Sequence, residues 1–279
     1  MKQFLLMITV LLTVSSQAQQ TEDQLIFRSF LEYARNERLA EKETGERVAA
    51  IGCFFIGTPY VGGTLEADGP ECLQINLRGL DCTTLVENVL ALNLMLQSEK
   101  TTFDTFKEKL TLIRYRDGIL DQYPSRLHYT SDWIGNNLAK GLIKVVCMGD
   151  SAMLFPLQLN FMSTHPEYYP ALEANTDFVA AMAAHETRIN DVSRLMYLPK
   201  ERVRAAGSCI QTGDIIAITT GTPGLDYSHL GLAIRDKNGQ VYLLHASSAA
   251  KKVVLSDKPL SDYLLDIKRH TGITVVRPL

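Results

Sequence analysis

The chain has 279 residues, of which 46% are hydrophobic and 21% charged, and its formal net charge at pH 7 is −3. A chain of this length and composition can bury a sizeable core, which excludes disordered, collagen-like and coiled-coil proteins. It has no basic block of the kind that marks a nucleic-acid-binding surface. We therefore expect a globular protein without a nucleic-acid partner.

The amino terminus has the three parts of a secretory signal peptide. Residues 1–3 carry a lysine, residues 4–14 are mostly apolar, and residues 16–18 form a small-x-small cleavage site. The apolar stretch is shorter than the roughly 20 residues that a membrane-spanning helix needs. We predict a signal peptide at 1–18, a single domain at 19–279, a periplasmic or secreted location, and no stable membrane insertion after cleavage.

Apolar residues recur at helical spacing over the first two thirds of the chain. The pattern predicts helices over 23–40 and 46–55, and a more regular helix that follows Asp81, whose side chain is expected to cap it. From about 98 to 205 three further stretches have helical spacing, and a short strand is predicted at 145–148. We interpret this last region as a mostly helical insertion.

The last third of the chain consists of short segments rich in β-branched and aliphatic residues. They predict strands at 214–219, 228–235, 240–246 and 273–276, separated by turns that contain glycine, proline or asparagine. Helices first and strands afterwards indicate an α+β domain with a small antiparallel sheet.

The number of cysteines is odd, so disulfide pairing within the chain leaves at least one thiol over. They are Cys53, Cys72, Cys82, Cys147 and Cys209. Only Cys82 falls at the first turn of a secure helix, where unpaired amides and the helix dipole favour a thiolate. Neither a CxxC nor an HExxH motif occurs, so there is no local signature for zinc. We predict Cys82 as a nucleophile and expect no metal or organic cofactor.

His229 and His245 lie on two predicted strands joined by a short hairpin, and the register of that hairpin decides whether they meet. A two-residue turn would place them on opposite faces of the sheet. A three-residue loop over 237–239, ending in a left-handed glycine, would pair Asp236 with Gln240 and make the histidines diagonal neighbours on one face. We predict the second register, because Asn-Gly suits a type I turn followed by a bulge.

If the three groups converge, each has a chemical role. His229 would take the thiol proton, or form an ion pair with the thiolate, and later protonate the leaving amine. His245 would hold the His229 ring through its other nitrogen. The Cys82 backbone N–H and the Tyr60 hydroxyl are candidate donors to the developing oxyanion. These roles predict amide hydrolysis through a thioester intermediate.

Five short blocks follow one another along the chain: residues 57–63 (Gly-Thr-Pro-Tyr-Val-Gly-Gly), 80–86 (Leu-Asp-Cys-Thr-Thr-Leu-Val), 213–217 (Gly-Asp-Ile-Ile-Ala), 228–232 (Ser-His-Leu-Gly-Leu) and 244–246 (Leu-His-Ala). In this order they resemble the motifs of NlpC-type papain-like cell-wall amidases. The resemblance implies a papain-like core, a triad of Cys82, His229 and His245, and Tyr60 near the oxyanion.

Within that superfamily, residues 57–66, the Asp-Cys-Thr-Thr sequence and the long helical segment are most similar to the N-acetylmuramoyl-L-alanine amidase-like branch. That branch cleaves between the muramic acid lactyl group and L-Ala, favouring soluble anhydro-muropeptides. The chain departs from the usual pattern at Thr83 and Thr84, where Ser-Gly is typical, and it has no recognisable SH3-like targeting domain. Two alternatives stay open, an endopeptidase for the D-Glu to diaminopimelate bond and a catalytically silent cell-wall-binding module.

Substrate choice is expected to reside in the insertion, because the other segments build the core. Trp133, with the tyrosines at 168–169 and the cluster at 114–116, is a candidate for sugar stacking and carboxylate binding, although a lone Trp on a helix also suits a core.

Three residues close to the predicted nucleophile and base complete the candidates. Glu66 and Asp81 are predicted to fix a peptide amine, and Ser228, next to the predicted base, to contact the substrate. The other histidines, His270 among them, show no partner pattern and are interpreted as surface or structural residues.

Overall fold

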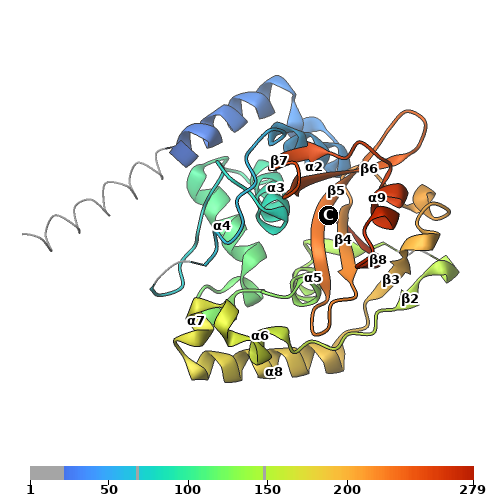
Figure 1. Cartoon of the computed structure of the whole chain (residues 1–279). Helices are drawn as coiled ribbons and strands as arrows, with labels where there is room; N and C mark the ends of the chain where they lie inside the picture. The colour runs from blue at the N-terminus through green and yellow to red at the C-terminus, as the bar shows by residue number, and fades with distance from the viewer. Residues whose placement is uncertain (1–21, 67–68, 147–148) are drawn as a thin grey trace, which may run out of the picture.

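The computed structural model describes residues 22–66, 69–146 and 149–279 (Figure 1). The predicted signal peptide at 1–18 lies outside these residues. Within the described ranges the chain combines helices with an antiparallel sheet, which confirms the predicted α+β class. No helix in these ranges is both long and apolar enough to cross a bilayer.

Helices fill much of the first two thirds of the chain, and one more lies near its end. A helix over residues 22–36 comes first, and the labelled helices are α2 (Thr44–Phe54), α3 (Cys82–Leu96), α4 (Phe103–Arg114), α5 (Thr130–Ala139), α6 (Phe161–Thr164), α7 (Pro170–Glu173), α8 (Thr176–Val192) and α9 (Leu260–Asp266). Residues three or four apart form the buried stripe, as Val48 and Ile51 do in α2. The helices predicted from this spacing are confirmed.

Within the described residues, eight strands form one sheet in which every paired neighbour is antiparallel. They are β1 (Ile143–Val145), β2 (Met153–Leu154), β3 (Met196–Pro199), β4 (Ile215–Thr220), β5 (Tyr227–Arg235), β6 (Val241–Ser247), β7 (Lys252–Leu255) and β8 (His270–Pro278). Their order is β2-β3-β8-β4-β5-β6-β7, and β1 pairs with another part of β8.

The sheet is larger than the small sheet predicted from the sequence. β7 and two strands of the insertion, β2 and β3, were not predicted, and the strand expected at 145–148 instead ends at Val145, with 147–148 outside the described residues. These strands are only two to four residues long. Such short segments carry little pattern of their own, and their pairing partners fix them. The insertion is therefore helical in part and also extends the sheet.

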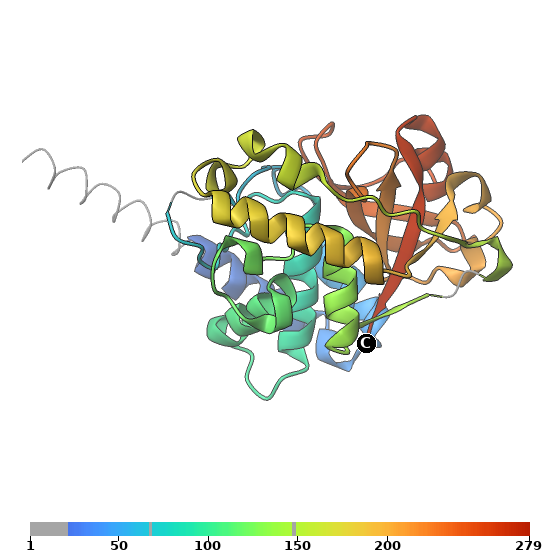
Figure 2. The ribbon, with the colours of Figure 1, turned by 90° about the horizontal axis from the view of Figure 1, so that it is seen from below.

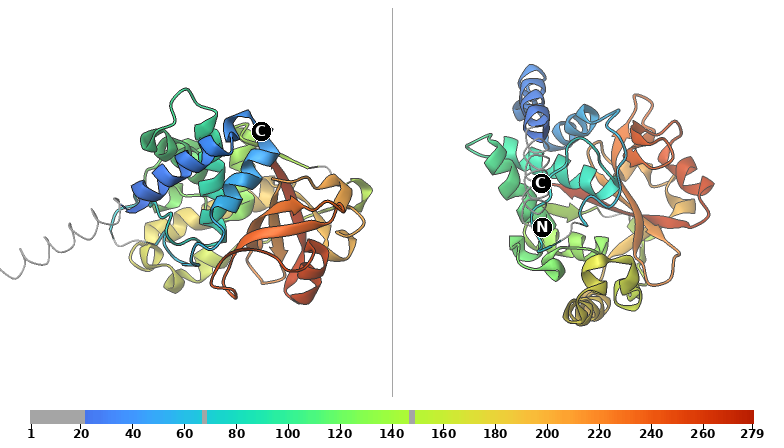
Figure 3. Two further views of the ribbon diagram at one scale, coloured as in Figure 1. Left: turned by 90° about the horizontal axis from the view of Figure 1, so that it is seen from above. Right: turned by 60° about the vertical axis from the view of Figure 1, so that its left-hand side comes forward.

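The sheet separates two hydrophobic cores. On β4, Ile215 and Ala217 face the core under α2 and α3, while Ile216 and Ile218 face the core under α9. This alternation follows from the period of two along a strand, and it leaves all of β4 buried. Figure 3 shows the amino-terminal helices and α9 on opposite sides of the sheet, and Figure 2 shows α8 running along the helical part. Each buried Ile contributes roughly 1.5–3 kcal/mol, so the central strands form a firm frame.

Candidate active site

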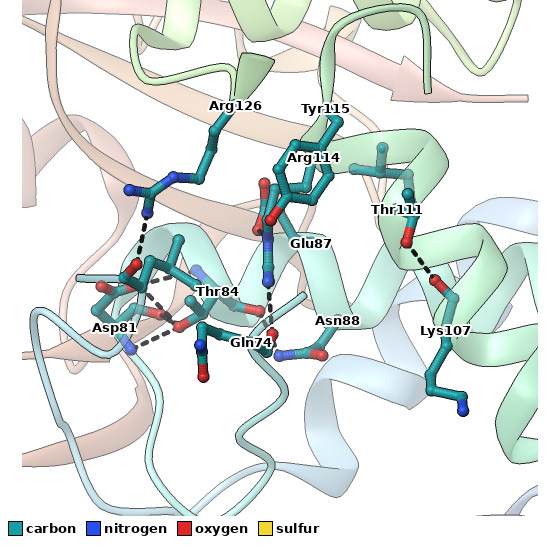
Figure 4. Close-up of polar contacts among 12 residues, drawn as sticks. Gln74, Asp81, Thr84, Glu87, Asn88, Lys107, Thr111, Arg114, Tyr115 and Arg126 are labelled. Carbon is teal, nitrogen blue, oxygen red and sulfur yellow. Dashed lines mark hydrogen bonds and ion pairs between the residues drawn. The ribbon is translucent and has the colours of Figure 1, made fainter. Parts of the chain in front are cut away.

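The predicted nucleophile, Cys82, is the first residue of α3. The helix is capped reciprocally: the Asp81 carboxylate accepts from the Thr84 N–H at 2.8 Å, and the Thr84 hydroxyl accepts from the Asp81 N–H at 2.9 Å (Figure 4). The predicted cap is confirmed, and caps of this kind stabilise by about 1 kcal/mol. The cap satisfies the amide of the third residue of α3, while the amide of Cys82 has no acceptor within the helix.

A buried ion pair fixes α3 against its neighbours. Glu87 of α3 and Arg114 of α4 are each 2% exposed, and their side chains meet at 2.7 Å. Arg114 also donates to the Gln74 carbonyl at 2.6 Å, which ties the loop before α3 to the same pair (Figure 4). The cluster at 114–116 was predicted to contact substrate carboxylates. The structure contradicts this for Arg114, which is buried and already paired.

The β5–β6 hairpin has the register that the sequence predicts. Arg235 pairs with Val241, and the Asp236 N–H donates to the Gln240 carbonyl at 2.9 Å, which leaves a three-residue loop. Gly239 at the end of this loop has a φ of 81°, in the left-handed region that suits glycine. The alternative two-residue turn is therefore excluded.

His229 and His245 are in direct contact. Nε2 of His229 lies 2.6 Å from Nδ1 of His245, and the two rings are nearly perpendicular. A β-bulge lies directly before His229: Ile218 of β4 pairs with His229 but Thr219 pairs with Tyr227, so Ser228 is the extra residue of β5. The predicted convergence of the two imidazoles is confirmed.

The thiol of Cys82 meets β5 at the point where β5 and β6 separate. The pairing of these two strands stops at Leu232 and Leu244, while β5 continues to pair with β4. The backbone N–H of Leu230 is therefore free of β6, and it donates to the Cys82 thiol. Because Leu230 directly follows His229, this hydrogen bond puts the sulfur against the backbone of β5 one residue along the chain from the predicted base.

Burial decides the protonation of the thiol. The pKa of Cys82 is raised to about 11, mainly by burial and to a smaller extent by the Asp81 carboxylate. Hydrogen bonds from Leu230 and Thr83 act in the opposite direction without outweighing burial. The expectation that the helix start favours a thiolate is therefore corrected, because loss of solvation is the larger effect here.

The two imidazoles are shifted toward their neutral forms. Burial lowers the pKa of His229 to about 3, with smaller contributions from His245, His270 and Arg269. Burial also lowers the pKa of His245 to about 4. Near pH 7 the ligand-free site thus holds a neutral thiol and two neutral imidazoles. Of the two predicted arrangements, proton abstraction by imidazole is favoured over a preformed ion pair.

Tyr60 is held close to Cys82 by backbone pairing. Tyr60 forms a parallel bridge with Leu80, two residues before Cys82, and its N–H donates to the Lys251 carbonyl at 2.9 Å. Burial raises the pKa of Tyr60, and the proximity of the Cys82 sulfur and of Asp81 raises it further. The phenol therefore keeps its proton at neutral pH and can donate a hydrogen bond.

The structure sorts the predicted substrate contacts. Trp133 is 3% exposed and belongs to the main core, so its predicted role in sugar stacking is wrong. Glu66 pairs with Arg126 at 2.8 Å, and Asp81 is occupied by the helix cap, so both carboxylates already have partners. Ser228 keeps a buried hydroxyl with no hydrogen-bond partner among the described residues.

Two residues beside the imidazoles were not predicted from the sequence. The Tyr263 ring of α9 packs on His245 with 5.3 Å between centroids, and buried His270 lies 6.0 Å from Tyr263 on the same measure. His270 had been interpreted as a surface or structural residue. Both residues follow β7 in the chain, and neither belongs to a sequence motif that would have indicated its place beside the imidazoles.

The described cysteines are all free thiols, and Cys147 lies outside the described residues. Across the described ranges, no group of three or more His, Cys, Asp and Glu side chains is arranged to hold a metal ion. Cys82 and the two contacting histidines are thus the chemically distinctive set in this part of the fold.

A protein-family model described as N-acetylmuramoyl-L-alanine amidase-like matches residues 50–273, a span that includes the thiol and both imidazoles. The chain belongs to this AmiA-like family. Curated protein sequences contain no match to this AmiA-like chain.

Solved structures agree with the family assignment. An N-acetylmuramoyl-L-alanine amidase from Bacteroides uniformis is 42% identical, with a TM-score of 0.78 over 85% of this AmiA-like chain and 100% of that chain. A protein from Bacteroides fragilis, provisionally named a xylanase, is 45% identical with a TM-score of 0.74, over 82% and 99% of the two chains. A Legionella pneumophila protein, 23% identical with a TM-score of 0.67 over 96% of each chain, shares the fold.

Proposed function

We propose that this AmiA-like protein is a cysteine-dependent N-acetylmuramoyl-L-alanine amidase that releases the stem peptide from soluble muropeptides. One observation carries the proposal. The Leu230 amide donates to the Cys82 thiol, and Leu230 directly follows His229, whose ring contacts His245. A nucleophile, a base and a group that orients the base are the minimum for covalent amide hydrolysis.

The hydrogen bond between the imidazoles assigns their nitrogens. Nε2 of His229 is engaged with His245, which leaves Nδ1 of His229 to receive the thiol proton. Nδ1 must then carry a lone pair, so the proton of neutral His229 sits on Nε2 and is donated to Nδ1 of His245. His245 thereby holds the ring and stabilises the imidazolium that forms during the reaction.

The steps of the reaction then balance. The Cys82 sulfur attacks the lactyl carbonyl while its proton moves to His229, and the oxyanion that forms is in reach of the Cys82 N–H and the Tyr60 hydroxyl. The C–N bond breaks as His229 returns the proton to the amine of L-Ala. Water then attacks the thioester with His229 as the base, which releases the muramic acid carboxylate and restores the thiol.

A neutral Cys82 thiol and a neutral His229 imidazole in the ligand-free site are consistent with this order of reaction steps. A thiol with a pKa raised by burial stays protonated until the imidazole removes its proton. An imidazole with a pKa far below 7 stays unprotonated and ready to act as a base. The same arrangement, a thiol at a helix start against an antiparallel sheet that carries both histidines, supports our inference of a papain-like core.

The substrate class rests on the family and on the amidase from Bacteroides uniformis. A xylanase, the name given to the Bacteroides fragilis relative, would need two carboxyl groups roughly 5 to 9.5 Å apart around the scissile bond. Beside Cys82 the nearest carboxylate in sequence is Asp81, and it is occupied by the helix cap. A thiol nucleophile with an imidazole base is typical of enzymes that catalyse acyl transfer, so we infer an amidase.

Mass spectrometry of products tests the proposal. The protein is incubated with an anhydro-disaccharide carrying a stem peptide, and we expect free sugar plus a peptide that begins at L-Ala. Cleavage after D-Glu would instead support the endopeptidase. Cys82→Ala should abolish product, whereas Cys209→Ala, which removes an exposed thiol, should leave turnover unchanged.

A silent binding module would give a different pattern. It would release neither product, and Cys82→Ala would leave binding to the muropeptide unaltered. We further propose that the protein is exported and loses residues 1–18. Amino-terminal sequencing of protein recovered from the periplasm or the medium tests this, with retention of residues 1–18 as the contrary result.

A further inference from the structure

α9 presents one aromatic side chain to the paired imidazoles. Leu260 and Leu264, four residues apart, are fully buried in the core under the sheet, and they fix the rotation of this short helix. The Tyr263 N–H donates to the Pro259 carbonyl at 3.0 Å. Tyr263 is therefore held by its own helix against the face of the sheet that carries His245.

The Tyr263 ring touches the second imidazole of the pair. Its centroid lies 5.3 Å from that of His245, with 72° between the planes, an edge-to-face geometry. His245 itself stands nearly perpendicular to His229. On its other flank Tyr263 meets the buried ring of His270 at 6.0 Å. Two aromatic contacts thus restrict the His245 ring, one from the base and one from Tyr263.

We propose that Tyr263 is a positioning residue, whose ring fixes the orientation of His245 and keeps water away from the contact between His245 and His229. The proposal rests on the proposed function, because it assigns Tyr263 a part in the same reaction. The 2.6 Å contact requires Nδ1 of His245 to face His229. Rotation of the His245 ring about the Cβ–Cγ bond would turn a ring carbon or the other nitrogen toward His229.

The surroundings of the imidazoles explain why excluding water matters. His229, His270, Arg269 and Cys82 are the titratable groups near this contact, and Lys200 lies near His270. Burial lowers the pKa of His245 to about 4, and the cause is loss of water. If the Tyr263 ring is removed, water enters and the pKa of His245 rises toward 6.5. The pair would then begin to take up protons at a higher pH.

Three substitutions of Tyr263 distinguish the effect of its aromatic ring from the effects of its hydroxyl group and of its side-chain volume. Tyr263→Phe keeps the ring and should retain kcat within about threefold. Tyr263→Leu and Tyr263→Met remove the ring and should lower kcat at least about tenfold, with KM changed less than about twofold. The acid limb of the kcat/KM profile should move to higher pH in the last two variants only.

Tyr242→Leu is the matched control. Tyr242 lies on the same strand as His245 but three residues away, so it faces the opposite side of the sheet, and its hydroxyl bonds to Gln240. This variant should leave the acid limb unchanged. The proposal is overturned if Tyr263→Phe loses as much kcat as Tyr263→Leu. It is also overturned if the folded Leu and Met variants keep the wild-type profile.

A measurement without substrate separates this proposal from the proposed function. NMR titration of the His245 ring nitrogens should show its pKa raised by Tyr263→Leu and unchanged by Tyr263→Phe and Tyr242→Leu. If the wild type cleaves no muropeptide while this shift occurs, the proposed function fails and the role of Tyr263 stands. An unshifted titration in folded Tyr263→Leu and Tyr263→Met refutes the positioning role whatever the activity.

Discussion

The hairpin of β5 and β6 and the insertion at 98–205 are built on different principles. In the hairpin, neighbours in the chain determine the geometry, since the three-residue loop sets the register that brings His229 to His245. The insertion is instead joined to the rest of the chain by contacts between separate segments, as Arg114 of the insertion meets Glu87 of α3 in a buried pair. The contrast teaches that residues brought together by the register of a hairpin can be predicted from the sequence. Polar residues that join distant segments, by contrast, resemble substrate-binding residues until their burial is known.

The largest expected effect is on activity, and it tests the contact between the two imidazoles in the β5–β6 hairpin. His229→Gln should lower kcat by about a hundredfold to ten-thousandfold, because the variant has no base for the thiol proton. His245→Gln should cost less, since it acts through His229. His185→Gln, on α8, is the control and should leave kcat unchanged in the muropeptide assay. An equal loss in all three variants would show that the contact between the imidazoles carries no special role.

The next effect tests the distant half. Glu87→Gln should destabilise the protein by about 3–5 kcal/mol, because it leaves the buried Arg114 guanidinium without a counter-charge. Urea unfolding measures the change. Replacing both residues by Met should recover much of the loss, since no buried charge is left unpaired.

An exposed ion pair is the matched control for this experiment. Arg38 and Glu41 meet at 2.7 Å on the surface, and Glu41→Gln should cost less than about 1 kcal/mol. A similar loss for Glu87→Gln and Glu41→Gln would contradict a structural role for the buried pair.

The pH dependence of thiol alkylation sharpens the comparison at the junction of α3 and β5. With the pKa of Cys82 raised to about 11, the alkylation rate should climb steadily with pH above 7 and show no plateau between pH 5 and 8. Asp81→Asn removes the carboxylate that raises this pKa, so the profile should shift to lower pH, while Asn still caps the helix and keeps Tm. A plateau from pH 5 to 8 in the wild type would reveal a thiolate–imidazolium pair instead.

The smallest effect concerns the hairpin loop. Gly239→Ala places a side chain at a φ of 81° and should destabilise by about 1–2 kcal/mol without changing kcat, because strand pairing still sets the register. Gly135→Ala is the opposite case, since a methyl group there meets nothing within 4 Å inside α5, and it should stabilise by about 0.5–1 kcal/mol. Thermal or urea unfolding distinguishes the signs.

The sequence was sufficient for the parts of the site that obey short-range rules. Asp81 could be recognised as a cap from the helix that follows it, and the two imidazoles could be placed together from the parity of two strands. The protonation of Cys82 could not, because burial depends on everything packed around the thiol, whereas the helix start is visible locally. At Cys82 the loss of solvation outweighs the positive end of the helix dipole.

The rest of the fold depended on tertiary partners. β7 pairs with the edge of β6, β1 and β3 pair with β8, and β2 pairs with β3, so these short strands depend on their partners. Trp133 was proposed to stack on sugars because an isolated aromatic residue on a helix gives no indication of which side faces solvent. Tyr263 could not be predicted from the sequence either, because its role depends on contact with the His245 ring, which is distant in the chain.

The bulge at Ser228 separates the turn before β5 from the stretch of β5 that carries His229. The turn before it, residues 221–226, can lengthen or shorten among homologues without turning His229 over, since strand pairing on the far side of the bulge resets the count. One residue inserted or deleted between His229 and Leu232 would turn the imidazole toward the opposite core, because side chains alternate between the two faces of a strand. Because this stretch pairs with the buried strand β4, we expect such a change to separate the two imidazoles and to disturb the centre of the sheet as well.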